Sequence, residues 1–185
     1  MKVSRTSLPD VLLIEPDVHR DERGFLVEHY QARRYASAGI RQDFVQDNVS
    51  FSQRGVLRGL HFQNPDPQAK LVTALTGEVF DVAVDVRLGS PTFGQWTAAV
   101  LSAKNNLQIY IPQGLAHGFC VTSETALVLY KCGDFYSASA ALSIRWDDPD
   151  IGIPWPIRQP RLSPADHDAP RLADIDRGLL PLYTP

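Results

Sequence analysis

The sequence predicts an all-β fold, a jelly-roll (cupin-like) antiparallel barrel with short peripheral helices. Most of the chain divides into short runs rich in Val, Ile, Leu and Phe, and Gly, Pro, Asn or Asp separates each run from the next. Some runs alternate apolar and polar side chains, as 79–86 does, which is typical of strands. Because the runs are short, evenly spaced and separated by tight turns, an antiparallel barrel or jelly roll is favoured over a parallel sheet. The interior of such a barrel is the expected place for a small ligand.

The turn signals and the apolar runs set the expected elements in chain order. The expected strands are 11–15, 25–30, 44–51, 56–62, 71–76, 79–86, 95–101, 107–111, 118–121, 126–131 and 142–145. Helical periodicity closed by Gly39 predicts a helix at 31–38, and a short helix is expected at 172–177. Four prolines between 154 and 164 end the sheet structure. We therefore assign 1–185 to a single jelly-roll domain with a C-terminal extension at 160–185.

Composition and charge exclude several classes of partner. A net charge of −3 offers no basic excess for nucleic acid or for a membrane surface. The N-terminus lacks an apolar signal core and no run is long enough to cross a bilayer, so a cytoplasmic protein is expected. The spacing of Cys120 and Cys132 matches neither a zinc motif nor a redox motif, and we expect both to be buried apolar side chains.

The segment 54–63, RGVLRGLHFQ, is the most informative stretch of the chain. It places a cation, Arg58, near a proton carrier, His61, on one strand of a buried sheet. Further polar residues are expected to point inward with them: Arg23, Glu28, Gln46, Asn48, Gln63, Lys70, His117 and Tyr130. Each alone has a structural explanation, such as a solvated charge, a satisfied core amide, a turn histidine or a half-buried aromatic. Together they would be costly to bury without a ligand, which favours a binding site.

The chemistry expected at this site is acid–base catalysis. A metal-binding jelly roll needs a His-x-His pair, and here the pair is His61-Phe62-Gln63, so no metal is expected. No nucleophile elbow, phosphate loop or dinucleotide fingerprint is present, so no cofactor is expected either. A C–H bond beside a ketone is less acidic than imidazolium by roughly ten pKa units, about 14 kcal/mol. A histidine base therefore needs a cation, Lys70 or Arg58, to stabilise the enolate oxygen.

Several motifs in order identify a family resemblance. They are 21–25 (DERGF), 44–48 (FVQDN), 55–63 (GVLRGLHFQ), 77–85 (GEVFDVAVD), 90–94 (SPTFG), 116–119 (AHGF) and 130–131 (YK). From near Leu8 to near Asp174, the chain resembles dTDP-4-dehydrorhamnose 3,5-epimerase, a jelly-roll enzyme of bacterial L-rhamnose biosynthesis. The resemblance implies inversion of C3 and C5 of dTDP-4-dehydro-6-deoxy-D-glucose, a dTDP-4-keto-6-deoxyhexose, to give dTDP-4-dehydro-L-rhamnose without a cofactor.

The resemblance also implies roles for individual residues. The catalytic set is His61 as base, Tyr130 as the acid on the opposite face, Lys70 beside the enolate, and Asp166 behind His61, with Asp168 as a register-shifted rival for Asp166. Arg23 and Arg58 resemble the clamps of the diphosphate. Phe25 and Tyr136 resemble base-stacking aromatics, and Glu28, Gln46, Asn48 and His117 match positions around the nucleotide-sugar. Family members are homodimers that exchange an N-terminal strand, so Arg23 and Phe25 are expected to serve the neighbouring subunit's pocket.

Three departures from the family pattern concern this site. His19 stands where Phe is usual, and Ala165 replaces a lysine in the motif 162–166. The segment 139–141, which ends in Ala141, lacks the glutamate that is usual near the nucleotide. Two alternatives stay open: a mono-epimerase acting at C3 or C5 of a related dTDP-4-keto-deoxysugar, and a non-catalytic sugar-nucleotide-binding protein. The second would need neither His61 nor Tyr130, and the presence of both argues against it.

Overall fold

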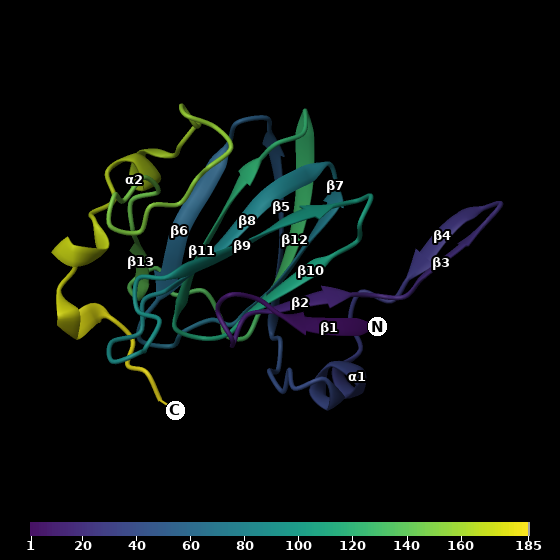
Figure 1. Cartoon of the computed structure of the whole chain (residues 1–185), viewed down its shortest axis with the longest axis horizontal. Helices are drawn as coiled ribbons and strands as arrows, with labels where there is room; N and C mark the ends of the chain where they lie inside the picture. The colour runs from purple at the N-terminus through teal and green to yellow at the C-terminus, as the bar shows by residue number, and fades with distance from the viewer. Residues whose placement is uncertain (185) are drawn as a thin grey trace.

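The computed structural model describes residues 1–184 and shows two antiparallel sheets packed face to face (Figure 1). The six-stranded sheet has the order β1 (Lys2–Arg5), β2 (Leu12–Glu15), β10 (Gln108–Ile111), β7 (Lys70–Thr76), β12 (Thr125–Cys132) and β5 (Gln46–Gln53). The five-stranded sheet has the order β13 (Ala141–Ser143), β6 (Leu57–Gln63), β11 (Leu115–Val121), β8 (Glu78–Asp85) and β9 (Trp96–Ser102). The predicted all-β architecture is confirmed.

Two apolar cores lie on the two sides of the five-stranded sheet. The first fills the space between the sheets and includes Val72, Val79 and Phe119. The second lies on the outer face, where Val82 and Val84 contact side chains of the C-terminal segment such as Leu172 and Ile175. Strand β8 is therefore buried on both faces, and its alternation sends odd and even residues into different cores.

A two-stranded arm, β3 (Val18–Asp21) and β4 (Gly24–Val27), projects from the body of the molecule (Figure 1). Phe25 is 54% exposed and Leu26 is 73% exposed. The sequence predicted only the second of these strands, as 25–30, and it predicted neither β3 nor β1. The pattern in β3, VHRD, lacks a buried face because the arm has no second layer to pack on in this chain. Alternation of apolar and polar residues predicts a strand only where one of its faces is buried.

The helices are short and lie at the periphery of the two sheets. Helix α1 (Ala32–Ser37) is capped by Gln31, close to the predicted bounds. The segment expected as one helix at 172–177 forms two 3₁₀ turns, η1 (Leu172–Asp174) and η2 (Arg177–Leu179). Helix α2 (Pro164–His167) was not predicted, although Ser163 at its N-cap followed by Pro164 is a usual start signal. None of the helices described is both long and apolar enough to span a bilayer. The assignment of the whole chain to one domain stays a prediction.

Candidate active site

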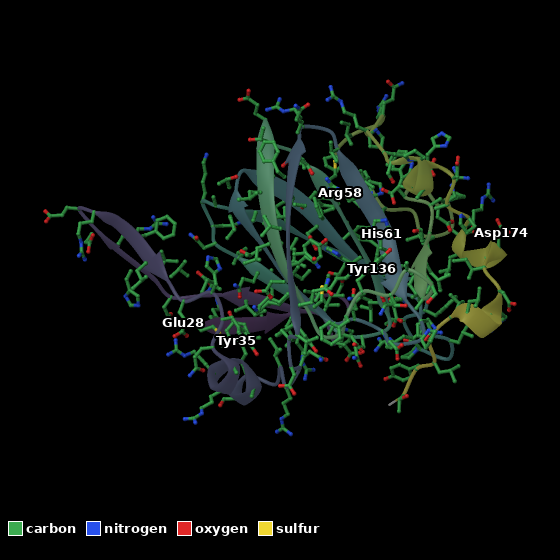
Figure 2. All side chains as sticks on the ribbon, turned by 180° about the vertical axis from the view of Figure 1, so that it is seen from behind. Glu28, Tyr35, Arg58, His61, Tyr136 and Asp174 are labelled. Atoms are coloured by element: carbon green, nitrogen blue, oxygen red, sulfur yellow. The ribbon has the colours of Figure 1, made fainter. Side chains whose placement is uncertain are left out.

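A cavity of about 580 Å³ opens between the two sheets. Strands β5, β7 and β12 form one wall, while β6, β13 and the start of α2 form the other. The lining side chains are Gln46, Asn48, His61, Phe62, Gln63, Gln68, Lys70, Tyr130, Tyr136, Ala141, Leu142, Ser143 and Ala165. Figure 2 shows His61 and Tyr136 on the same side of the molecule, with Arg58 further along β6. A cavity of this size and mixed polarity is suited to a polar small molecule.

Strand register places the polar side chains of the first wall in rows. Cys132 of β12 lies opposite Gln46 on one side and Lys70 on the other. Two residues along the strands, Tyr130 lies opposite Asn48. Directly opposite residues in an antiparallel pair share a face of the sheet, so alternation alone aims all five side chains at the same interior.

His61 and Asp166 form a close pair at the second wall. His61 Nε2 lies 2.5 Å from Asp166 Oδ1. The Asp166 side chain is only 4% exposed, whereas His61 presents 45% of its side chain to the cavity side. Burial opposes ionisation of Asp166, but the hydrogen bond and charge interaction with His61, with further hydrogen bonds from Ser163 and the Gly59 backbone, hold its pKa below the usual value. A buried carboxylate in this position fixes the tautomer and the orientation of the imidazole.

Lys70 and Tyr130 face His61 from the opposite sheet. Burial lowers the pKa of the Lys70 ammonium. Burial raises the pKa of the Tyr130 phenol, and the neighbouring Arg58 offsets part of that rise. The cavity therefore holds a phenol that keeps its proton at neutral pH and a lysine whose charge is poorly hydrated, which suits it to stabilising a developing oxyanion.

A second histidine–aspartate pair lies behind the cavity. His117 Nε2 is 2.9 Å from Asp81 Oδ2, and both residues are buried. His117 pairs with His61 in the ladder between β11 and β6, so it lies next to the cavity but not among its lining residues. Burial lowers the pKa of His117, which disfavours the imidazolium. No functional role was predicted for Asp81, although the alternation of β8 turns it toward the same interior as Val79 and Ala83.

The structure does not bring all the predicted residues together. Arg58 was expected to be buried on its strand; it is exposed instead, and its Nε donates to Ser52 Oγ at 3.1 Å. Arg23 and Phe25 lie on the arm, where Arg23 pairs with Asp21. Glu28 lies at the root of the arm, 3.0 Å from Arg34. Figure 2 shows Glu28 at the side opposite to Tyr136. Within one chain, the expectation that Arg23 and Glu28 point into the barrel is wrong, because the arm carries their backbone away from it.

The structure also locates the three departures from the family pattern and distinguishes between the two candidate aspartates. Ala141 and Ala165 both line the cavity, so its rim is uncharged at these two points. His19 lies on the arm and lines a second cavity at the arm's root. Asp168 is exposed and pairs with His167, whereas Asp166 is the carboxylate that contacts His61.

Two further observations concern cysteines and metals. Cys120 and Cys132 are free and buried, as predicted, and Asn48 Nδ2 donates to Cys132 Sγ at 3.4 Å. Within residues 1–184, no group of three or more His, Cys, Asp or Glu side chains is arranged to hold a metal ion. The expected absence of a metal stays a prediction.

Comparison with known proteins decides the family. A model of the dTDP-4-dehydrorhamnose 3,5-epimerase family matches residues 5–174. The chain belongs to this family. A dTDP-4-dehydrorhamnose 3,5-epimerase from Pseudomonas aeruginosa is 52% identical over 178 residues, covering 95% of this chain and 98% of the relative. The predicted resemblance is confirmed, and with it the jelly-roll fold.

Two further relatives show the range of activities in the family. The structure of a dTDP-6-deoxy-D-glucose-3,5-epimerase from Legionella pneumophila, in complex with dTDP-4-keto-L-rhamnose, matches with a TM-score of 0.98 and 51% identity over 100% of this chain and 99% of that one. A dTDP-4-dehydrorhamnose 3-epimerase from Streptomyces niveus is 40% identical over 186 residues, covering 99% of this chain and 90% of the relative. The family therefore includes enzymes that are named for one centre as well as for two.

Proposed function

We propose that this protein is a dTDP-4-dehydrorhamnose 3,5-epimerase, which inverts C3 and C5 of dTDP-4-dehydro-6-deoxy-D-glucose. The observation that carries the proposal is the position of His61 and Tyr130, which line one cavity from opposite sheets with Lys70 in the same wall as Tyr130. An epimerase needs this arrangement, because the proton must leave one face of the sugar and return to the other. Relatives that are 48% to 52% identical are named for both centres, whereas a relative named for C3 alone is 40% identical, which supports a double inversion over a single one.

In this mechanism His61 is the base. Asp166 engages Nε2, which leaves the Nδ1 lone pair to accept the proton beside the C4 ketone. Asp166 also stabilises the imidazolium that results. Lys70 stabilises the enolate oxygen, and this stabilisation offsets part of the gap of about 14 kcal/mol between the carbon acid and imidazolium. Tyr130 then delivers a proton from the opposite face.

The same proposal assigns the nucleotide to the rest of the cavity. Gln46 and Asn48 supply amide groups beside Lys70 and Tyr130, and Tyr136 supplies an aromatic ring at the rim, 64% exposed and available for a nucleobase. Arg58, exposed further along β6, supplies a forked donor for the diphosphate. His117 lies behind the cavity wall, where its pair with Asp81 holds it, and we assign it to the surroundings of the nucleotide-sugar.

We further propose a homodimer in which the arm crosses to the partner. The arm exposes Phe25 and Leu26, and the edge strand β5 exposes Val49 (59%) and Phe51 (61%), so both present apolar surface suited to a second copy. Crossing would bring Arg23, Phe25 and Glu28 to a neighbouring cavity. Sedimentation equilibrium should give twice the chain mass of 20.6 kDa; a monomer at micromolar concentration would exclude strand exchange. A cytoplasmic location stays a prediction that cell fractionation would check.

The experiment that tests the activity is solvent exchange in D₂O. The protein is incubated with dTDP-4-dehydro-6-deoxy-D-glucose, and proton NMR counts the carbons that acquire deuterium. We expect label at both C3 and C5 and a product with the L-rhamno configuration. Label at one centre only would indicate the mono-epimerase. Substrate binding without any exchange would indicate a non-catalytic binding protein.

The alkaline limb of the pH profile tests the role of Lys70. Burial holds the pKa of Lys70 below that of an ordinary lysine, so the cation is lost as pH rises through that lowered pKa and kcat/KM should fall with it. The substitution Lys70→Arg keeps the charge at all accessible pH values. We expect the altered geometry to lower kcat/KM at neutral pH roughly tenfold. The alkaline limb should move to higher pH, where loss of the proton from the Tyr130 phenol would determine it. An alkaline limb that is identical in both proteins would contradict this role.

A further inference from the structure

The loop between β12 and β13 carries two exposed aromatic side chains. Phe135 is 65% exposed and Tyr136 is 64% exposed, and Tyr136 lines the rim of the cavity. The loop contains no helix or strand of its own. An aromatic ring on an irregular loop would lose conformational entropy on binding a ligand, unless other contacts already hold the loop.

Gln63 supplies such contacts from the end of β6. Its Oε1 accepts from the Ser137 backbone N–H at 2.9 Å, and its Nε2 donates to the Phe135 carbonyl at 3.1 Å. The carboxamide therefore binds the peptide groups on both sides of Tyr136, as a neighbouring strand would. Nε2 also donates to the Asp66 carbonyl at 2.5 Å, and Gln63 is only 4% exposed, so the side chain is fixed.

Two more glutamines hold the same loop. Gln46 Oε1 accepts from the Tyr136 backbone N–H at 3.0 Å, and Gln68 Nε2 donates to the Asp134 carbonyl at 2.8 Å. Gln63 differs from these two because it bonds residues on both sides of Tyr136. It also occupies the position where a metal-binding jelly roll would have the second histidine of its His-x-His pair, and no role in the proposed proton transfer uses it.

We propose that Gln63 is a positioning residue that holds the Tyr136 loop in the conformation that binds the nucleotide. The inference rests on the proposed function, in which Tyr136 stacks on the nucleobase. Gln63 acts on substrate affinity through the loop, because its side-chain hydrogen bonds go to Asp66, Phe135 and Ser137 and to none of the proton-transfer groups. Its loss should therefore change KM and leave kcat nearly intact.

The variant Gln63→Leu removes all three hydrogen bonds at similar side-chain volume. We expect KM for the dTDP-sugar and Kd for dTDP alone, measured by calorimetry, to rise about tenfold while kcat changes less than about twofold. The variant Gln63→Met also removes all three hydrogen bonds at similar side-chain volume, and its Kd should rise by the same factor if the leucine variant does not fold. Gln53→Leu is the matched control, because Gln53 is exposed and its Oε1 accepts only from Arg161 among the bonds described; its Kd should equal that of the parent. A parent-like Kd in both Gln63 variants would overturn the inference.

A double-mutant cycle separates positioning from direct contact, since Gln63 also lines the cavity. In a Tyr136→Ala background, Gln63→Leu should cause no further rise in Kd, because the ring that it positions is gone. Additive effects of the two substitutions would mean that Gln63 binds the ligand directly, and would overturn the inference while leaving the proposed function intact. A parent-like Kd in Tyr136→Ala alone would remove the stacking role itself, and the inference with it; D₂O exchange still tests the epimerase activity independently.

Discussion

Replacing His61 by alanine is expected to lower kcat/KM by a factor of about 10³ or more, because in the proposed mechanism the imidazole is the general base that breaks the first C–H bond. Binding of dTDP should stay within about twofold of the parent, since the amides of Gln46 and Asn48 and the ring of Tyr136 are untouched. Deuterium incorporation from D₂O should disappear at both carbons. Single-turnover NMR and calorimetry with dTDP measure the two effects separately.

The chain offers a matched control for this substitution. His167 also pairs with an aspartate, Asp168, but that pair lies at the surface, and His167→Ala should leave exchange and turnover unchanged. Asp166→Asn should lower kcat by about 10²-fold, less than the loss of His61, because the imidazole stays but its orientation and its charged form lose their partner. Retention of parent-like exchange in His61→Ala would exclude the mechanism. If His167→Ala lost exchange to the same extent, the assignment of the base to His61 would be wrong.

Local pattern predicted those parts of the fold in which one strand packs against others. Strands β5 to β12 alternate or are continuously apolar, and their predicted positions lie within a few residues of the observed ones. Strands β1 and β3 were not predicted because neither has a buried face: β1 is an edge strand and β3 belongs to the projecting arm. The route of the arm depends on what it packs against, and a period-2 pattern does not carry that information.

The same distinction applies to the candidate site. Alternation placed Gln46, Asn48 and Tyr130 on one inner face correctly, because register fixes which side chains share a face. It failed for Arg58, which precedes Gly59, where the backbone has a φ of +121° and the simple alternation is broken. It also failed for Arg23 and Glu28, because the arm carries their backbone away from the cavity of this chain. The pair of His61 with Asp166 joins residues 105 positions apart, so motif resemblance suggested it where periodicity could not.

The substitution Tyr130→Phe should separate the two halves of the reaction. It removes the phenolic proton but keeps the ring that packs between Asn48 and Val72 in the ladder, so the fold should persist. His61 still removes the C5 proton and can return a deuteron to the same face, so exchange at C5 should stay within about tenfold of the parent. Formation of the inverted product should fall about 10²-fold or more, because no acid is left on the opposite face. Time-resolved NMR in D₂O measures both rates in one sample.

Tyr110→Phe is the matched control for this experiment. Tyr110 lies on β10 outside the cavity lining, and burial raises the pKa of its phenol as it does for Tyr130, so the two substitutions remove similar groups from different places. Exchange and inversion should both be parent-like in Tyr110→Phe. If exchange and product formation fall by the same factor in Tyr130→Phe, then Tyr130 acts before the proton leaves carbon, and the return from the opposite face must come from another group. If only product formation falls, the two faces of the sugar are served by different residues, as the proposed mechanism requires.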